Sequence, residues 1–551
     1  MMMHLVTRIR LAATGILLTA SITPLAAADM PLTKAESSGY TATSTYADVM
    51  AFIHELQQRT SRMRVESLGT STEGRDIPLL IIGNPAPASP ADLRYDRRAV
   101  VYFQANIHAG EVEGKDAALM LARDLTMGEA SKYLDRLVVL IAPIFNPDGN
   151  ERISTANRAS QNGPAGGVGV RFNGQNLDLN RDGIKLETPE VQGLVQKVLV
   201  RWDPVFFLDA HTHNGSYHQE PVTWVWGLNP NGDPAIFDYM AGTVWPAIER
   251  QMRERYSTAT IPHGDFQDVK NPTLGWVPLG PEPRYLSNYV GLRNRLAVLD
   301  EQYPYVDFET RVKGAHDLMR SFLDFLATHR DEVVALVSKA DRRAIVRGAN
   351  PTASDVFVID AEPAAIDRKL TIQGFEMEVT DTGSRYPQVH PTDVRRTYRD
   401  VPYLAKYVPK RTVQLPRAYL IAVQDKAVIG KLREHGIVVQ RLVAPATLNV
   451  EAFSVTRLTG SQYSDQGHYP STVEGTYSQK EVVFPAGSYY VSMAQPLANM
   501  AAQLLEPEST DGLAVWNFFD RYIAFQWIPQ PMEYPVYRLH EAVRLVTDTV
   551  P

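Results

Sequence analysis

A histidine and a glutamate stand three residues apart at His108 and Glu111, directly after the apolar run 99–105. Side chains at a strand end that leads into a helix can converge on one point. A catalytic zinc ion takes three protein ligands, commonly imidazole nitrogens and carboxylate oxygens, and keeps a fourth position for water. This pair could therefore supply two of the three ligands, although a His-x-x-Glu spacing on its own is common by chance.

A third ligand could come from the segment that follows another apolar run, 205–210, about a hundred residues further along the chain. His211 could complete a His/Glu/His set, and Asp209 could orient its ring from behind. His213 competes with His211, because residues two apart on a strand point to the same face. Taken alone, such a segment more often holds a core or surface histidine.

Two further segments carry groups that could act beside a metal. Asn180 and Arg181 could clamp a carboxylate, because a guanidinium presents a planar bidentate fork. Glu301 follows an apolar run and could accept a proton from a metal-bound water, with Asp300 as the competing acid. Alone, the first pair is more often a turn or a surface ion pair, and the acid is more often an N-cap or a solvated group.

Composition narrows the chemistry. The 551-residue chain has no cysteine, so disulfides, thiolate catalysis and cysteine-ligated metals are excluded, and any metal must be held by histidines and carboxylates. The formal net charge of −7 argues against nucleic acid or an anionic membrane as the main partner. The sequence contains no His-Glu-x-x-His motif, no serine nucleophile elbow and no P-loop.

The candidate residues follow apolar runs that alternate with helical periodicity. Strands are expected at 99–105, 137–144, 205–210 and 295–300, after an antiparallel pair at 65–68 and 77–82. Helices are expected at 45–60, 111–125, 188–200, 234–256 and 309–329. Apolar strands without alternation, separated by helices, predict an α/β fold with a mixed, mostly parallel sheet and helices on both faces. Sites in such sheets form beyond the carboxyl ends of the strands, where the candidates lie.

The pattern changes after the charged stretch 339–343. We expect a catalytic domain over residues 29–340 and a C-terminal accessory module of mixed α/β structure over 345–551. In this module we expect strands at 417–423, 437–442 and 489–493 and helices at 427–435 and 496–505.

Residues 1–28 have the pattern of a secretory signal. Arg8 and Arg10 precede the apolar stretch 11–25, and small residues up to Ala28 form a cleavage site. A membrane anchor is the alternative, but the stretch is shorter than the ~20 residues that a spanning helix needs. We therefore expect a secreted or periplasmic protein without a membrane anchor.

Taken together and in this order, the segments resemble the carboxypeptidase A-like zinc metallocarboxypeptidases over residues 40–330. Flanking landmarks contribute to the resemblance: Glu73-Gly74-Arg75, Asn146-Pro147-Asp148-Gly149 and Asn157-Arg158. The resemblance implies the carboxypeptidase-like fold, one zinc ion per chain, and hydrolysis of the last residue from peptides with a free C-terminus.

The resemblance also implies a role for each matching residue: zinc ligation for His108, Glu111 and His211; binding of the substrate's terminal carboxylate for Asn180 and Arg181; stabilisation of the oxyanion for Arg158; and general base catalysis for Glu301. The family also has a mobile tyrosine over the substrate, for which Tyr285 and Tyr289 are candidates. Asp182 and Gly183 follow the Asn-Arg pair at a place where the digestive enzymes of the family have an aromatic residue. We therefore expect a binding cleft that differs from that of the digestive enzymes.

Two alternative functions stay open. The same zinc site could act on peptidoglycan stem peptides or on a non-peptide amide, or the chain could be an inactive peptide-binding protein. The side-chain preference is not fixed either, because Asp265, Asp268 and Glu282 all lie in the stretch expected to form the pocket. Few residues separate the cleavage site from the first catalytic helix, so we expect no activation pro-segment.

Overall fold

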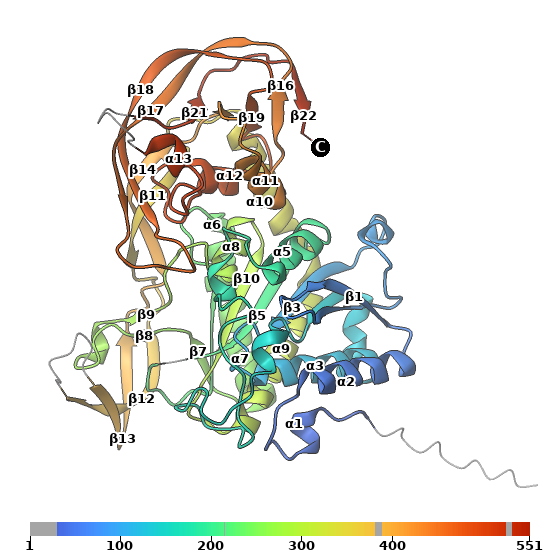
Figure 1. The fold of residues 1–551 in the computed structure, drawn as a ribbon. Coiled ribbons are helices and arrows are strands. Elements are labelled where there is room, and N and C mark those ends of the chain that lie inside the picture. Colours follow the sequence, from blue (N-terminus) through green and yellow to red (C-terminus); the bar gives the residue numbers. More distant parts are fainter. Residues whose placement is uncertain (1–29, 214, 381–387, 525–531, 551) are drawn as a thin grey trace, which may run out of the picture.

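The computed structural model describes residues 30–213, 215–380, 388–524 and 532–550 (Figure 1). The expected signal segment, residues 1–28, lies outside the described residues. Among the helices within these ranges, none is both long enough and apolar enough to cross a membrane.

An eight-stranded sheet forms the centre of the N-terminal part, in the order β1-β2-β4-β3-β5-β10-β6-β7. The strands are β1 (Met63–Thr70), β2 (Asp76–Ile82), β3 (Ala99–Ala105), β4 (Leu137–Ala142), β5 (Phe206–Thr212), β6 (Val222–Trp226), β7 (Thr260–Pro262) and β10 (Leu296–Gln302). Strands β4, β3, β5 and β10 run parallel to one another, whereas β1, β2 and β6 join by antiparallel pairing. The mixed, mostly parallel sheet is therefore confirmed.

Two of these strands, β6 and β7, were not predicted. The five residues of β6 lie between Pro221 and Gly227. A short apolar run of this kind has no period that separates a strand from a core helix segment. It forms a strand because its backbone groups pair with those of β10.

Helices cover both faces of the central sheet (Figure 1). One face packs on α2 (Tyr46–Arg59), α3 (Glu113–Met127), α7 (Trp245–Tyr256) and α9 (Phe308–Thr328), and the other on α5 (Pro189–Gly193), η4 (Leu194–Val200) and α8 (Leu286–Leu292). Val101 and Phe103 of β3 belong to the first core, and Val100 and Tyr102 to the second. Because successive strand residues point to opposite faces, burial on both sides accounts for the unbroken apolar runs.

Two expected helices are less regular than their patterns indicated. The helix expected at 188–200 is α5 followed by the π-helical η4, and that expected at 234–256 is α6 (Pro234–Tyr239), the π-helical η5 (Met240–Val244) and α7. Pro246, which has no N–H to donate, lies at the start of α7. The helix expected at 111–125 begins at Glu113, so Glu111 lies in the loop before it.

The C-terminal part is built on a second sheet, with the order β18-β17-β21-β15-β19-β16-β22 and β20 paired with β17. Its strands are β15 (Ala418–Ile421), β16 (Gln440–Leu442), β17 (Ala446–Gly460), β18 (Ser471–Phe484), β19 (Tyr489–Ser492), β20 (Met532–Glu533), β21 (Val536–Leu539) and β22 (Thr547–Thr549). The helices are α11 (Lys426–Glu434), α12 (Ala498–Leu505) and α13 (Asp520–Ile523). Strands β15, β16 and β19 and helices α11 and α12 lie where they were expected. The long hairpin β17–β18 was not expected.

Smaller elements complete the described chain. Two-stranded ribbons pair β11 (Val356–Ala364) with β14 (Lys406–Gln414), β12 (Leu370–Thr380) with β13 (Gln388–Val401), and β8 (Asp265–Phe266) with β9 (Trp276–Val277). The short helices are α1 (Lys34–Ser37), η1 (Pro90–Leu93), η2 (Glu129–Asp135), α4 (Pro147–Asn150), η3 (Leu179–Arg181) and η6 (Pro272–Leu274).

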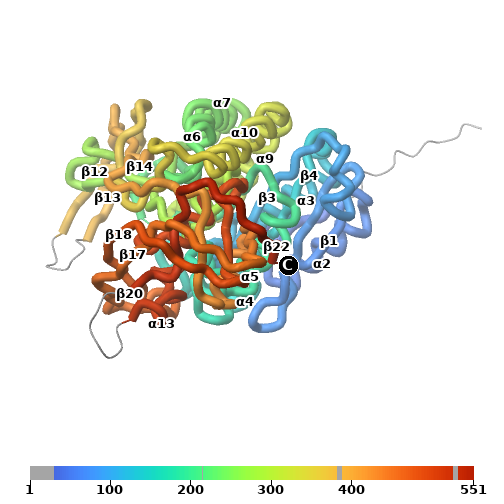
Figure 2. The backbone as a smooth tube through the Cα atoms, turned by 90° about the horizontal axis from the view of Figure 1, so that it is seen from above, coloured from blue at the N-terminus to red at the C-terminus, as the bar shows by residue number. Residues whose placement is uncertain are grey.

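The N- and C-terminal parts share a hydrophobic core. The boundary expected at 340–345 falls inside α10 (Arg330–Ala349), which continues without a break. One core cluster joins Val198 and Ile184 from the first part with Ile437 and Met493 from the second. Seen from above, the C-terminal sheet lies over the middle of the molecule beside α5 (Figure 2). The division into two units stays a proposal, and the packing makes the two parts close neighbours.

Two helical glycines test this junction. A Cβ built on Gly348 of α10 would lie 1.8 Å from the carbonyl oxygen of Met493, whereas one on Gly430 of α11 would meet no atom within 4 Å. Gly348→Ala should lower the free energy of unfolding by about 1–3 kcal/mol through overpacking. Gly430→Ala should raise it by up to about 1 kcal/mol, because alanine favours helix. Calorimetric unfolding midpoints check both, and equal shifts would contradict the close packing at Gly348.

Candidate metal centre

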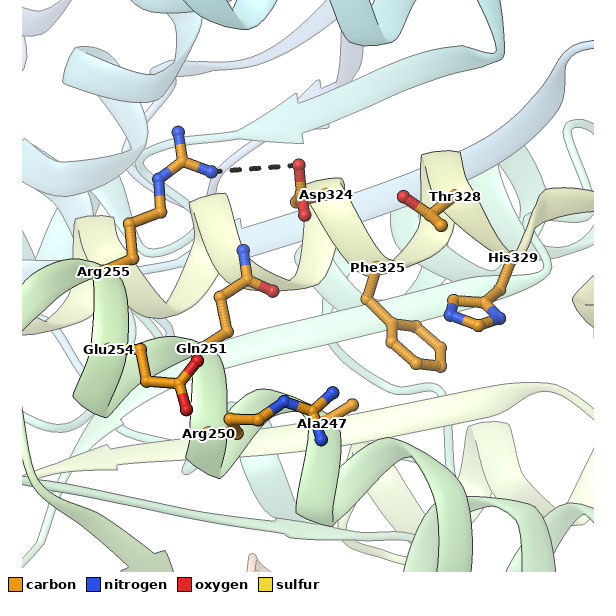
Figure 3. A pocket seen from close by; sticks show the side chains of 9 residues that line it. All are labelled: Ala247, Arg250, Gln251, Glu254, Arg255, Asp324, Phe325, Thr328 and His329. Carbon is orange, nitrogen blue, oxygen red and sulfur yellow. Dashed lines mark ion pairs between the residues drawn. The ribbon is translucent and has the colours of Figure 1, made fainter.

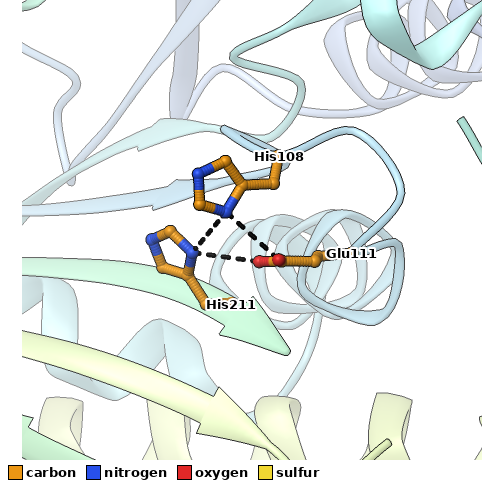
Figure 4. Close-up of side chains that lie close together, drawn as sticks. All are labelled: His108, Glu111 and His211. Atoms are coloured by element: carbon orange, nitrogen blue, oxygen red, sulfur yellow. Dashed lines mark hydrogen bonds and ion pairs between the residues drawn. The ribbon is translucent and has the colours of Figure 1, made fainter. Parts of the chain in front are cut away.

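His108, Glu111 and His211 meet at the carboxyl ends of two neighbouring strands (Figure 4). Strands β3 and β5 are parallel partners, with Ala105 opposite Ala210, so the loop after β3 and the end of β5 lie at the same edge of the sheet. His108 Nδ1 is 3.1 Å from Glu111 Oε1, and His211 Nδ1 is 3.0 Å from Glu111 Oε2. The two Nδ1 atoms are 3.1 Å apart. The ligand set expected from the sequence is thus assembled in one place.

A glycine lets the His108–Glu111 loop close this tightly. A Cβ on Gly110 would lie 2.6 Å from Cδ of Arg158 and 2.9 Å from the carbonyl oxygen of Gly169. Both distances are shorter than real Cβ contacts, so a larger residue would push the loop away from its neighbours. The backbone N–H of Glu111 donates to the carbonyl of His108 at 2.9 Å, which turns both side chains to the same side.

A carboxylate holds each imidazole from behind. His108 Nε2 lies 3.0 Å from Asp178 Oδ1, and His211 Nε2 lies 2.9 Å from Asp209 Oδ2. A neutral ring that donates a hydrogen bond from Nε2–H to a carboxylate keeps a lone pair on Nδ1, and such partners orient metal-ligating histidines. Both lone pairs then point at the same small space beside Glu111.

This arrangement fits a zinc ion. Two imidazole nitrogens and a carboxylate oxygen are ligands that catalytic zinc takes. All three side chains are almost fully buried, and two lone pairs 3.1 Å apart would repel each other without a positive charge between them. Burial would lower the pKa of His211, but Asp209 and Glu111 raise it well above its usual value. The surroundings therefore stabilise positive charge at the point where the three side chains meet.

Glu111 is held as a carboxylate. Burial would raise the pKa of Glu111, yet the neighbouring His108 and Arg158 hold it well below its usual range. Arg158 Nη1 is 2.9 Å from Glu111 Oε1, and the backbone N–H of Thr212 donates to Oε2 at 3.1 Å. These contacts favour the ionised form of Glu111, which is the form that binds a metal.

Of the two acids at the end of β10, Glu301 faces the metal centre. β10 pairs with β5 so that Glu301 lies opposite His211. Glu301 lines the cleft at the metal centre, and Asp300 is not among its lining residues. The carboxylate of Asp300 accepts a hydrogen bond from Gln302 Nε2 at 2.7 Å. Burial raises the pKa of Glu301 to about 8, with His211 opposing this and Glu111 adding to it.

Asn180 and Arg181 line the same cleft. Asn180 Oδ1 accepts the backbone N–H of Leu286 at 2.9 Å, which leaves its amide group near His211. The Arg181 guanidinium lies 4.6 Å from the centre of the Tyr285 ring, and a quarter of its side chain is exposed. An exposed cation beside a metal centre can bind the carboxylate of a substrate.

The structure separates the residues that the sequence left as competitors. His213 lies just beyond the end of β5, where its Nδ1 accepts the N–H of Gly215 at 2.9 Å, so it lines the cleft without joining the His/Glu/His group. Of the two tyrosines, Tyr285 lines the cleft, whereas Tyr289 is buried and bonds to His435 Nδ1 at 2.7 Å.

Arg171 is a cleft residue that the sequence analysis missed. Its Nε is 2.8 Å from Asp178 Oδ2, and it lines the cleft beside His108 and Glu111. Arg158, the arginine matched by the resemblance, bonds to Glu111, to Gln161 and to the Thr212 carbonyl and is not among the lining residues. Arg171 follows an irregular glycine-rich stretch, in which no period indicates which side chain points inward.

The cleft is a hollow of about 470 Å³ around the metal centre. Its lining residues are His108, Glu111, Arg171, Asn180, Arg181, His211, Thr212, His213, Gly215, His263, Asp265, Pro278, Leu279, Tyr285, Leu299 and Glu301. Another hollow, between α7 and α9, contains the Arg255–Asp324 ion pair and no residue expected in the site (Figure 3). The chemistry is therefore assigned to the cleft at the strand ends.

Comparisons with known proteins identify relatives of this chain. Residues 49–183 match the family model described as zinc carboxypeptidase. Carboxypeptidase 2 of Trichophyton rubrum is 24% identical over 519 residues, covering 89% of this chain and 85% of the relative. Carboxypeptidase D of Rattus norvegicus is 28% identical over 211 residues, covering 32% of this chain and 15% of the relative.

Among solved structures, a metallo-carboxypeptidase from Burkholderia cenocepacia is 18% identical, with a TM-score of 0.39 over 52% of this chain and 70% of that chain. The family match and the curated relatives confirm the resemblance to the zinc metallocarboxypeptidases. They also support the prediction of a zinc metallocarboxypeptidase hydrolase.

Asp178 offers a test of the metal centre that leaves the ligands intact. Asp178→Asn keeps the size of the side chain but removes the charge behind His108, so we expect the dissociation constant for zinc to rise about 10–100-fold. Competition with a chromophoric chelator measures this constant. Asp367→Asn, at an exposed position, is the matched control and should leave it unchanged. Equal zinc affinity in the two variants would contradict the role of Asp178.

Proposed function

We propose that this chain, a hydrolase of the zinc metallocarboxypeptidase class, removes residues one at a time from the C-terminus of peptides, with one zinc ion per chain. The observation that carries the proposal is the position of Arg181 and Glu301 in the same cleft as the His/Glu/His group. This combination supports the proposal, because one substrate could then meet a carboxylate-binding cation, a proton acceptor and a metal centre.

Zinc held by His108, Glu111 and His211 would lower the pKa of a bound water and polarise the scissile carbonyl. Glu301 is placed to take the proton of the attacking water and to return it to the leaving amine. Its burial and its raised pKa favour the second step, because the carboxyl holds the proton until the leaving amine takes it. His108 and Arg158 favour the ionised form of Glu111.

Arg181 and Asn180 are proposed to select the end of the chain. The guanidinium can bind the terminal carboxylate through two parallel hydrogen bonds, and its stacking on Tyr285 limits the positions that it can take. A terminal carboxylate bound by Arg181, in the same cleft as the metal centre, would bring only the last peptide bond to the reacting position. This constraint is what makes the activity that of an exopeptidase.

An arginine is proposed to stabilise the negative oxygen of the tetrahedral intermediate. The resemblance assigns this role to Arg158, whereas the lining of the cleft favours Arg171. Arg158 donates to Gln161, to Glu111 and to the Thr212 carbonyl, and we propose that it acts on the site through the Glu111 carboxylate. We therefore place Arg171 at the oxyanion and Arg158 behind Glu111.

The proposal includes export from the cytoplasm, supported by the charged start, apolar stretch and small-residue site within residues 1–28. A peptide in the periplasm or outside the cell is then the natural substrate. We also propose that the mature chain needs no proteolytic activation. An inactive purified protein that became active after trypsin treatment would contradict this.

A peptide mixture with free C-termini, and the same peptides as C-terminal amides, test the function. We expect mass spectrometry to show loss of single C-terminal residues from the free acids and little change in the amides. Glu301→Gln should lower kcat at least about 100-fold while the protein still binds zinc, because the proton acceptor is lost. Asp300→Asn is the matched control and should retain most of the activity, because Asp300 does not line the cleft.

The other outcomes are equally informative. Cleavage of amides as fast as acids would rule out carboxylate selection by Arg181. Bound zinc without trimming of any peptide would move the substrate to peptidoglycan stem peptides or a non-peptide amide. Absence of zinc from the purified protein would favour a peptide-binding role without catalysis.

The two arginines can be distinguished by kinetics. Arg171→Gln should lower kcat about 100–1,000-fold, which is the usual cost of removing a donor to an oxyanion. Arg158→Gln should lower it less, by under about tenfold, because Thr212 still donates to Glu111. Steady-state kinetics on one peptide measures both. The reverse order of the two losses would return the oxyanion role to Arg158.

A further inference from the structure

The hairpin β17–β18 of the C-terminal part ends in a tight turn. Asp465 and His468 exchange two backbone hydrogen bonds, of 2.8 and 2.9 Å, across the turn. The two residues between them, Gln466 and Gly467, have φ angles of +53° and +81°. Positive φ at both central residues is the geometry of the two-residue hairpin turn that matches the twist of the strands. The turn is therefore a well-defined element rather than an irregular loop.

The three polar side chains of this turn each contact a different segment of the catalytic part. Gln466 Oε1 accepts the backbone N–H of Asp178 at 2.8 Å. Asp465 Oδ2 pairs with Arg284 Nη1 at 3.0 Å. His468 Nε2 lies 2.9 Å from a carboxylate oxygen of Glu187. Three contacts on three segments fix both the position and the orientation of the turn.

The central contact leads directly to the metal centre. Asp178 is the residue whose carboxylate holds His108 Nε2, and its other oxygen accepts a hydrogen bond from Arg171. It is also the N-cap of the short helix η3, which carries Asn180 and Arg181. The position of the Asp178 backbone therefore bears on a metal ligand and on both residues proposed to bind the substrate carboxylate.

The outer contacts stabilise the same surroundings. Arg284 precedes Tyr285, which lines the cleft, and it also pairs with Asp511 at 2.8 Å. The backbone N–H of Glu187 donates to Asp182, the residue that follows Arg181, at 2.9 Å. Arg181 stacks on Tyr285. The turn thus contacts the chain on both sides of Arg181, at Asp178 and Glu187, and also contacts Arg284, which precedes Tyr285.

We propose that Gln466, at the tip of the β17–β18 hairpin, is a positioning residue for the metal centre and acts through the backbone of Asp178. The C-terminal part is then a component of the catalytic unit rather than an appendage to it. The consequence for zinc binding depends only on the His/Glu/His site, and the consequence for catalysis rests on the proposed function.

The effect would pass through one hydrogen bond, from the backbone N–H of Asp178 to the side chain of Gln466. Without the acceptor of Gln466, the Asp178 N–H needs a water partner, and the backbone can shift to find one. Loss of a direct partner of a metal-ligating histidine typically costs 10–100-fold in metal affinity. Gln466 is one step further away, so we expect an effect of about tenfold.

Three variants of the full-length protein test the inference. Gln466→Leu keeps the size of the side chain and removes the acceptor, whereas Gln466→Glu keeps an acceptor oxygen at the same reach. Gln479→Leu makes the first change at an exposed glutamine on β18 of the same hairpin and is the matched control. The zinc dissociation constant of each apoprotein is measured by chelator competition, together with kcat and KM for a peptide and the unfolding midpoint.

We expect Gln466→Leu to weaken zinc binding about tenfold and to lower kcat/KM, with an unfolding midpoint close to that of the unchanged protein. Gln466→Glu should restore zinc binding, and Gln479→Leu should not alter it. If Gln466→Leu does not fold, Gln466→Asn, which is one methylene too short for the contact, takes its place with the same expectation.

Equal zinc affinity in Gln466→Leu and the unchanged protein would overturn the inference. So would equal losses in Gln466→Leu and Gln466→Glu, because the acceptor would then be irrelevant. Weaker zinc binding in Gln466→Leu, rescued by Gln466→Glu, in a protein that cleaves no peptide would support the inference and refute the proposed function instead.

Discussion

The structure depends on keeping two imidazole lone pairs and one carboxylate directed at the same point in a buried space. Such a group of donors repels itself, so each member needs a second partner that fixes its direction. Asp178 and Asp209 provide this for His108 and His211 by accepting hydrogen bonds from their Nε2–H groups. Arg158 and the N–H of Thr212 provide it for Glu111. These four contacts hold the three metal-binding side chains in their directions.

The central sheet turns these constraints into a fixed geometry. Parallel pairing of β3, β5 and β10 brings three loops to one edge, so residues separated by about a hundred positions meet without long side chains. Burial of both faces of the sheet makes this edge rigid, because none of the three strands can shift without disturbing a packed core. The partly exposed side chains of Arg171 and Arg181 line the cleft beside the buried ligands, where substrate can reach them.

The C-terminal part completes the arrangement from the other side. Lys431 donates to the Leu186 carbonyl at 2.9 Å, and His435 Nε2 lies 3.0 Å from the Ile184 carbonyl. The Lys185 ammonium lies 3.9 Å from the centre of the Trp516 ring. These contacts, with those of the hairpin turn, hold the loop that follows Arg181 against the second sheet. The loop has little regular structure of its own, so its shape comes from these long-range partners.

The sequence by itself determined the donor types, their order along the chain and the strands before them. It also determined the absence of thiol ligands. Apolar runs and residue types are local properties, so β3, β4, β5 and β10 could be predicted closely. Only the tertiary structure separated His211 from His213 and Glu301 from Asp300, because these choices depend on where a strand ends and which core each face meets. It alone revealed Arg171 and Gln466, whose roles rest on contacts between distant loops that no local pattern encodes.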